Sequence, residues 1–176
     1  MIKYDPDRHH RRSIRLREYD YSQEGAYFIT ACTQKHDLLL DNIEIRSMIQ
    51  KWWDVLPEKF PDVRTDQFVI MPNHIHGIIF IEHLGQSHGI GQSHRIAPTL
   101  GRIVQWFKTM TPNEYIKAAR TNNAEPFPVK LWQRNYYEHI LRNETDLNSA
   151  RQYILDNPAK WEEDEDNPRN LAQEMK

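Results

Sequence analysis

The chain has 176 residues and a formal net charge of −2, and 39% of its residues are hydrophobic and 11% aromatic. This composition is typical of one folded domain with a sizeable core, and it excludes a wholly disordered chain. No apolar run approaches the roughly 20 residues of a membrane span, and no signal peptide opens the chain, so we expect a soluble, cytoplasmic protein without a membrane partner. The single cysteine, Cys32, excludes an internal disulfide framework and is expected to be a small buried residue.

Charge is distributed unevenly along the chain. Residues 8–17 are strongly basic, whereas residues 162–166 form an acidic cluster. We therefore divide the chain into a basic N-terminal arm (1–24), a folded domain (25–161) and an acidic C-terminal tail (162–176). A basic arm is suited to a polyanion such as DNA, although two solvated termini explain the charge equally well.

The first half of the chain shows three strands and one helix. Residues 26–33 are β-branched and aromatic and predict a strand. Apolar residues at three- and four-residue spacing predict a helix over 43–60 that closes around Pro57. A strand over about 64–70 then leads through a short Met-Pro-Asn link into another strand that begins near His74, so these two strands are expected to be antiparallel neighbours.

The second half begins with a glycine- and serine-rich loop and continues with two helices and a strand. The loop, residues 83–98, contains three histidines to which we assign no function: His83, His88 and His94. Thr99 is the expected N-cap of a helix that Thr111 and Pro112 interrupt. A strand is predicted over residues 129–137.

A last helix is marked by signals at both of its ends. Asn143 and Asp146 resemble a capping box, and Pro158 is expected to terminate the helix after residues 147–156. The order strand, helix, strand, strand, helix, strand predicts an α+β fold of the ferredoxin-like, split β-α-β type. Its antiparallel sheet would have the histidine strand at its centre and the additional C-terminal helix beside it.

The pair His74 and His76 is the main chemical signal. Side chains alternate along a strand, so both imidazoles share one face while Ile75 points into the core. Such a pair is a half-site for a divalent metal and needs further ligands from elsewhere. On the last helix, Tyr153 and Asn157 are four residues apart and share a face.

Several segments together resemble the REP-associated tyrosine transposases of the HUH single-tyrosine transposase superfamily. Met-Pro-Asn-His-Ile-His carries the His-hydrophobic-His motif for which the superfamily is named. The likeness extends over about residues 12–161. The segments that carry it are 12–16, 19–21, 71–76, 99–108, 131–144 and 153–158.

The resemblance implies a chemistry and a set of residues. It implies cleavage and joining of single-stranded, hairpin-flanked DNA through a 5′-phosphotyrosine intermediate, with Tyr153 as the nucleophile. It implies a metal site of His74, His76 and Asn157, for which a hard ion, Mg²⁺ or Mn²⁺, is expected. Tyr136 and Tyr137 remain possible alternative nucleophiles, although both fit better as sheet or base-stacking residues.

DNA binding is assigned to six basic residues: Arg11, Arg12, Arg15, Arg17, Lys108 and Arg134. Both a monomer and a homodimer are consistent with the sequence. Three other functions are weighed against a transposase: a rolling-circle replication initiator or relaxase-like nickase, a non-catalytic nucleic-acid hairpin binder, and a zinc protein. The scattered histidines lack the regular spacing with cysteine that a zinc protein shows.

Overall fold

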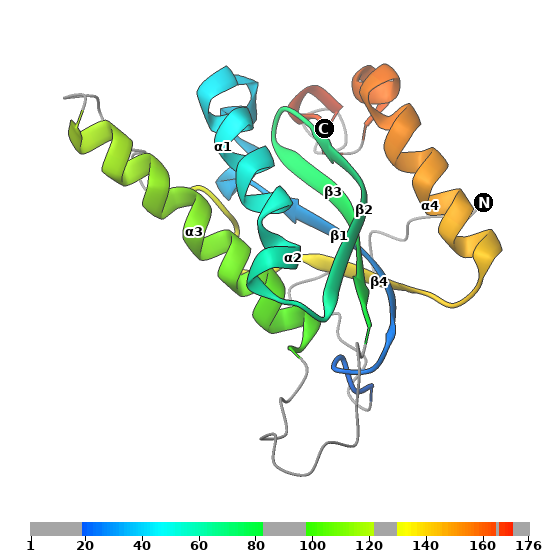
Figure 1. Cartoon of the computed structure of the whole chain (residues 1–176). Coiled ribbons are helices and arrows are strands. Elements are labelled where there is room, and N and C mark those ends of the chain that lie inside the picture. The colour runs from blue at the N-terminus through cyan, green and yellow to red at the C-terminus, as the bar shows by residue number, and fades with distance from the viewer. Residues whose placement is uncertain (1–18, 83–97, 122–129, 165, 171–176) are drawn as a thin grey trace, which may run out of the picture.

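The computed structural model describes residues 19–82, 98–121, 130–164 and 166–170 (Figure 1). Four strands and four α-helices form the framework of this part of the chain. In chain order they are β1 (Gly25–Cys32), α1 (Ile43–Asp54), α2 (Leu56–Lys59), β2 (Val63–Ile70), β3 (His74–Ile81), α3 (Leu100–Thr121), β4 (Tyr137–Leu141) and α4 (Glu144–Asp156). Short 3₁₀ helices lie at Gln34–His36, Leu39–Asp41 and Asn157–Glu163.

The strands form one antiparallel sheet in the order β2-β3-β1-β4. This order and the alternation of strands and helices are those of the ferredoxin-like split β-α-β fold, so the predicted fold class is confirmed. The histidine strand, β3, is central and pairs with β1 and β2. Thr30 lies opposite His76, and Cys32 lies opposite His74, in the register of β1 and β3.

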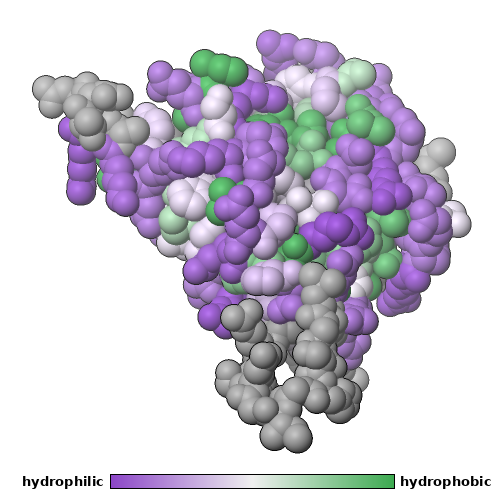
Figure 2. Space-filling view, viewed as in Figure 1, coloured by the Kyte–Doolittle hydropathy of each residue, from purple (hydrophilic) through white to green (hydrophobic). Residues whose placement is uncertain are grey.

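Helices cover both faces of the sheet. Figure 1 shows α1 and α3 on one face and α4 on the other. Ile75 and Ile79 of β3 are fully buried in the larger core beneath α1 and α3, whereas Ile78 is buried with Ile154 of α4 on the opposite face. The surface in Figure 2 is mainly hydrophilic, with apolar atoms in small separate groups.

Gly77 allows α1 to approach the sheet closely. Trp53 of α1 stacks on Phe68 of β2, with ring centroids 4.2 Å apart. A Cβ at Gly77 would lie 2.3 Å from Cη2 of Trp53. The space that a side chain would need in the middle of β3 is therefore occupied by the indole ring.

Two predicted boundaries are wrong. Helix α3 continues through Pro112, and its neighbour Thr111 donates to the carbonyl of Phe107 and accepts from the indole N–H of Trp132. These contacts and packing against α1 retain the helix despite the local cost of proline. Of the strand predicted over 129–137, the described residues before Tyr137 are irregular apart from an isolated bridge between Trp132 and Thr33, and β4 begins only at Tyr137.

The cap of α4 follows the predicted pattern. The Asn143 side chain accepts from the backbone N–H of Asp146 at 2.8 Å, and the Asp146 carboxylate accepts from the N–H of Arg142 at 3.3 Å. The helix begins at Glu144 and ends at Asp156, and the 3₁₀ helix that follows carries the chain past Pro158. Tyr153 therefore lies in the last turn of α4, and Asn157 at its C-cap.

Candidate metal centre and tyrosine

The imidazoles of His74 and His76 converge on a common point. Both are almost completely buried, and their Nε2 atoms lie 3.0 Å apart. Two ligand atoms that each lie about 2.1 Å from one ion are separated by about 3.0 Å when they subtend a right angle, as in octahedral coordination. Two nitrogen atoms at this distance either share a proton or share a cation.

The other ring nitrogen of each histidine is held by a polar side chain. Nδ1 of His74 lies 2.9 Å from Oδ1 of Asn73, and Nδ1 of His76 lies 2.8 Å from the hydroxyl of Thr30. The Asn73 amide nitrogen donates to two backbone carbonyls, so its oxygen faces His74 and accepts from Nδ1–H. The proton of His74 is therefore held on Nδ1, and Nε2 keeps a lone pair with which to bind a metal ion. Metal-binding histidines are commonly oriented by such a hydrogen bond from their other ring nitrogen.

Burial keeps both imidazoles neutral. Loss of solvation lowers the pKa of His74 from 6.5 to about 4, with an opposing effect from the nearby Asp166 carboxylate. Burial, and then the neighbouring His74, lower the pKa of His76 well below its usual value. A neutral imidazole is the form that binds a metal ion, so the pair is ready to bind metal at neutral pH.

Tyr153 lies beside the histidine pair and is accessible from outside. Its ring centroid is 5.2 Å from that of His76 and 5.8 Å from that of Phe28, which itself stacks on His76. Half of the Tyr153 surface is exposed. The three rings together place the tyrosine next to the buried pair while leaving it open to a substrate.

Asn157, one helical turn after Tyr153, is buried with an unused acceptor. The residue is 3% exposed, and its Oδ1 atom has no hydrogen-bond partner. A buried amide oxygen normally has such a partner, because its desolvation is costly. An oxygen in this state fits a role as a metal ligand.

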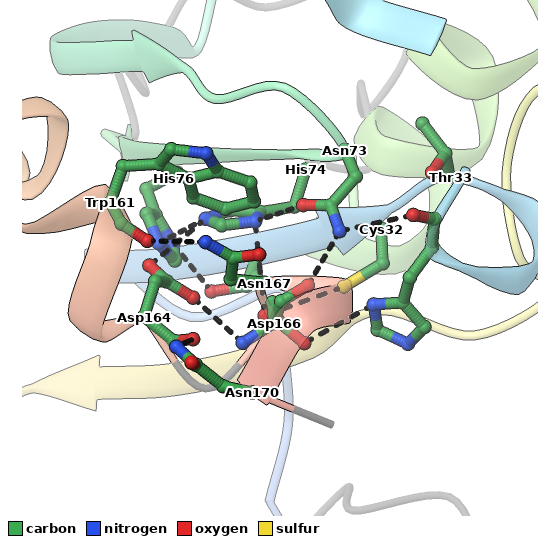
Figure 3. A network of polar contacts seen from close by, with 12 residues as sticks. Cys32, Thr33, Asn73, His74, His76, Trp161, Asp164, Asp166, Asn167 and Asn170 are labelled. Atoms are coloured by element: carbon green, nitrogen blue, oxygen red, sulfur yellow. Dashed lines mark hydrogen bonds and ion pairs between the residues drawn. The ribbon is translucent and has the colours of Figure 1, made fainter. Parts of the chain in front are cut away.

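Sequence reasoning missed the carboxylates that approach the pair from the C-terminal segment. Oδ2 of Asp164 lies 3.9 Å from Nε2 of His74, and Oδ2 of Asp166 lies 3.9 Å from its Nδ1 (Figure 3). These three residues offer ligand atoms that all lie within 4.8 Å of one another. The acidic cluster of residues 162–166 was the available signal, but its position in space depends on the chain folding back after α4.

Three comparisons relate the chain to known proteins. No protein-family model matches it. An uncharacterized protein of Haemophilus influenzae is 39% identical over 180 residues, which cover 93% of this chain and 96% of that protein. A second protein of the same organism, named "Putative REP-associated tyrosine transposase", is 28% identical over 147 residues, covering 80% of this chain and 74% of the relative.

A solved REP-associated tyrosine transposase, bound to a REP hairpin, has the same fold. It matches with a TM-score of 0.55 and 19% identity, over 85% of this chain and 74% of its own. The chain is therefore similar to REP-associated tyrosine transposases, in sequence to one curated relative and in fold to one solved structure. Among the residues that the structure describes, no helix is long and apolar enough to cross a membrane.

The other two tyrosines considered as nucleophiles have different surroundings from Tyr153. Tyr136 packs against the core on the α1 and α3 side, with the Lys108 ammonium 6.0 Å from its ring. Tyr137 opens β4 opposite Thr30, and partial burial raises its pKa. Tyr153 therefore approaches the histidine pair from α4. Tyr137 lies in the same row of the sheet as His76, but β1 is between their strands.

The basic residues predicted to bind DNA have different surroundings. The Lys108 ammonium donates to the backbone carbonyls of Gln133, Arg134 and Asn135 at 2.6, 3.2 and 3.0 Å. All three of its N–H groups are thereby used to hold the irregular segment before β4, a role that the sequence did not indicate. Arg134 is exposed. The other predicted DNA-binding residues lie outside the described residues: Arg11, Arg12, Arg15 and Arg17.

Proposed function

We propose that this protein is a transposase, a metal-dependent endonuclease and strand transferase for single-stranded DNA, with Tyr153 as its nucleophile. The observation that carries the proposal is the position of an accessible tyrosine beside two buried, neutral imidazoles whose Nε2 atoms lie 3.0 Å apart. Chemistry at a phosphodiester needs both an attacking oxygen and neutralisation of the phosphate charge. The closeness of Tyr153 to His76 supports the assignment of both roles to this site.

The residues present fit a divalent cation. His74 and His76 would hold it through Nε2, and the unpartnered Oδ1 of Asn157 would be a further ligand. The Asp164 carboxylate is close enough to His74 to contribute. When bound, Mg²⁺ or Mn²⁺ would polarise a non-bridging phosphate oxygen and thereby favour attack at phosphorus.

Tyr153 supplies the attacking oxygen of the proposed reaction. The phenolic oxygen of Tyr153 forms a bond to phosphorus, and the bond from phosphorus to the 3′ oxygen breaks. The phenolic proton is released to solvent, and the departing 3′ oxygen takes up a proton from solvent and becomes a free hydroxyl. The products are a 5′-phosphotyrosine and a 3′-OH, which by the reverse reaction at another end joins two strands.

The proposed substrate is a DNA hairpin with an adjoining single strand. The solved relative was bound to a REP hairpin, which supports a substrate of this shape. A single-stranded segment is needed because a phosphodiester must reach Tyr153, which lies beside the buried pair His74 and His76. The basic N-terminal arm and the exposed Arg134 would contact the phosphate backbone.

Trapping of the covalent intermediate tests the proposal. A suicide oligonucleotide that consists of a hairpin and an adjoining single strand should form a covalent adduct with the full chain in Mg²⁺ or Mn²⁺. The adduct should disappear in Tyr153→Phe and persist in Tyr136→Phe and Tyr137→Phe. Loss of the adduct in EDTA and in His76→Ala would connect the reaction to the histidine pair.

Other outcomes assign a different function. A chain that binds the hairpin without ever forming an adduct in either metal is a hairpin-binding protein. An adduct that survives in Tyr153→Phe but is lost in Tyr137→Phe would move the nucleophile to β4. An adduct formed on any single strand regardless of a hairpin would contradict the proposed substrate.

A further inference from the structure

We propose that Cys32, His36 and Asp166 form a second metal site, suited to Zn²⁺, next to the histidine pair. The site does not depend on the function proposed above. Its ligands come from the end of β1, from the 3₁₀ helix Gln34–His36, and from the C-terminal segment. They are separated by up to 134 positions in the sequence.

The geometry of the three side chains is close to that of a zinc centre. One oxygen of the Asp166 carboxylate lies 3.3 Å from Nδ1 of His36, and the other lies 3.9 Å from Sγ of Cys32. One ligand atom from each residue lies within 4.8 Å of the other two. Zinc bonds of about 2.0–2.3 Å in a tetrahedral arrangement separate their ligand atoms by about 3.3–3.6 Å.

The imidazole of His36 presents a buried nitrogen to this point. Its Nδ1 atom has no hydrogen-bond partner and lies in ion-pair range of the Asp166 carboxylate, at 3.3 Å. Cys32 is the only cysteine in the chain. Figure 3 shows Asp166 directed toward Cys32. A buried nitrogen, a thiol and a carboxylate therefore converge without satisfying one another fully.

The ligand types select the ion. A thiolate with an imidazole and a carboxylate suits Zn²⁺, whereas Mg²⁺ and Mn²⁺ prefer oxygen ligands. Burial raises the pKa of the Cys32 thiol. Metal binding would nevertheless displace the thiol proton to solvent, because a metal ion binds the thiolate. Three protein ligands leave one position for water.

A shared residue links this site to the histidine pair. The Asn73 amide donates to the backbone carbonyls of His36 and Asp166, while its oxygen accepts from His74. A cation at Cys32 would hold the C-terminal segment, which carries Asp164, against the end of the sheet. We expect it to hold this segment in place and not to bind the substrate, because Asp166 approaches His74 on the side that carries Nδ1.

Cobalt titration of the full, reduced chain tests the site. Co²⁺ bound to a thiolate gives a near-ultraviolet charge-transfer band, and Cys32 is the only cysteine, so a band can arise from no other residue. We expect a band that saturates at one equivalent, disappears on addition of Zn²⁺ and is absent in Cys32→Ser. His36→Ala and Asp166→Asn should weaken cobalt binding by about 10-fold or more.

Matched variants separate this site from the histidine pair. His74→Gln should keep the band, and Asp41→Asn, which removes an exposed carboxylate, should leave the affinity unchanged. The proposal is overturned if the wild-type chain shows no band. It is also overturned if His36→Ala and Asp166→Asn, folded as judged by circular dichroism, bind Co²⁺ as tightly as wild type. Neither result would bear on Tyr153.

Discussion

Arg151 of α4 and Asp66 of β2 form a two-pronged ion pair. Nε of the guanidinium lies 3.1 Å from Oδ1 and Nη2 lies 2.6 Å from Oδ2. The Arg151 contact lowers the pKa of Asp66, with burial opposing it. Because Tyr153 is two residues further along the same helix, this pair fixes the helix that carries the proposed nucleophile onto the sheet that carries the histidines.

Loss of this pair should slow adduct formation more than it harms folding. Arg151→Lys keeps the charge but loses the parallel hydrogen bonds, so we expect a several-fold slower formation of the Tyr153 adduct. The melting temperature should fall by only a few degrees. Lys51→Ala, which removes an exposed ion pair with Glu114, is the control and should change neither measurement. Equal effects of the two variants would contradict a positioning role for Arg151.

Asn73 should control the affinity of the histidine pair for metal. Asn73→Ala removes the acceptor for Nδ1–H of His74, and loss of such a partner typically weakens binding by about 10- to 100-fold. Asn73→Asp retains the acceptor for Nδ1–H and should bind metal more tightly than Asn73→Ala, but it should lower the free energy of unfolding, because a carboxylate oxygen would face the carbonyls of His36 and Asp166 in place of the amide N–H groups. Calorimetric titration with Mn²⁺ in the absence of DNA measures both. An unchanged affinity in Asn73→Ala would show that the amide does not orient His74.

Metal-free protein should lose stability as the pH falls from 6.5 toward 4. In that range the unfolded chain binds a proton at His74 while the folded chain does not, because burial lowers the folded pKa to about 4. The unfolded state therefore holds more protons, and stability rises with pH. The loss attributable to His74 is on the order of 3 kcal/mol at about 1.4 kcal/mol per pKa unit.

Urea denaturation at pH 7 and pH 5 measures this effect. His74→Gln, which does not titrate at this position, should reduce the dependence between these two values, and the part due to the buried His76 should remain. His139→Gln, a substitution on β4, is the comparison and should retain it. If His74→Gln and wild type lose the same free energy of unfolding between pH 7 and pH 5, burial of His74 is not the cause.

Gly77→Ala should destabilise the fold. The added Cβ would meet the Trp53 ring at 2.3 Å, a distance that forces the indole or the strand to move. Overpacking of this kind costs about 1–3 kcal/mol. Gly25→Ala is the matched control, because its nearest contacts would be ordinary ones at 3.7 Å. Chemical denaturation of both variants should show a loss of stability at position 77 that exceeds any change at position 25.

Arg134 and Lys108 should respond differently to substitution. Arg134→Ala should weaken hairpin binding and reduce its dependence on salt by about one phosphate contact. Lys108→Ala should lower the melting temperature, since its ammonium holds three carbonyls before β4. Binding measured over a range of salt concentrations, together with thermal denaturation, distinguishes the two. A reduced salt dependence in folded Lys108→Ala would return that residue to the DNA-binding surface.

Local patterns in the sequence determined much of the site. Alternation along a strand puts His74 and His76 on one face wherever that strand lies, and helical spacing puts Tyr153 one turn before Asn157. The order of strands and helices was sufficient for the ferredoxin-like fold, because few topologies satisfy it with an antiparallel sheet. These features depend on residues near one another in the chain.

Only the tertiary structure decided which distant groups surround the pair. The return of the chain after α4 brings Asp164 and Asp166 to His74, and it brings Asp166 to Cys32. The ion pair of Arg151 with Asp66 likewise joins residues 85 positions apart. No spacing rule predicts such contacts, because they result from how α4 and the segment after it pack on the sheet. The sequence therefore determined the ligands on each element, and packing determined which elements meet.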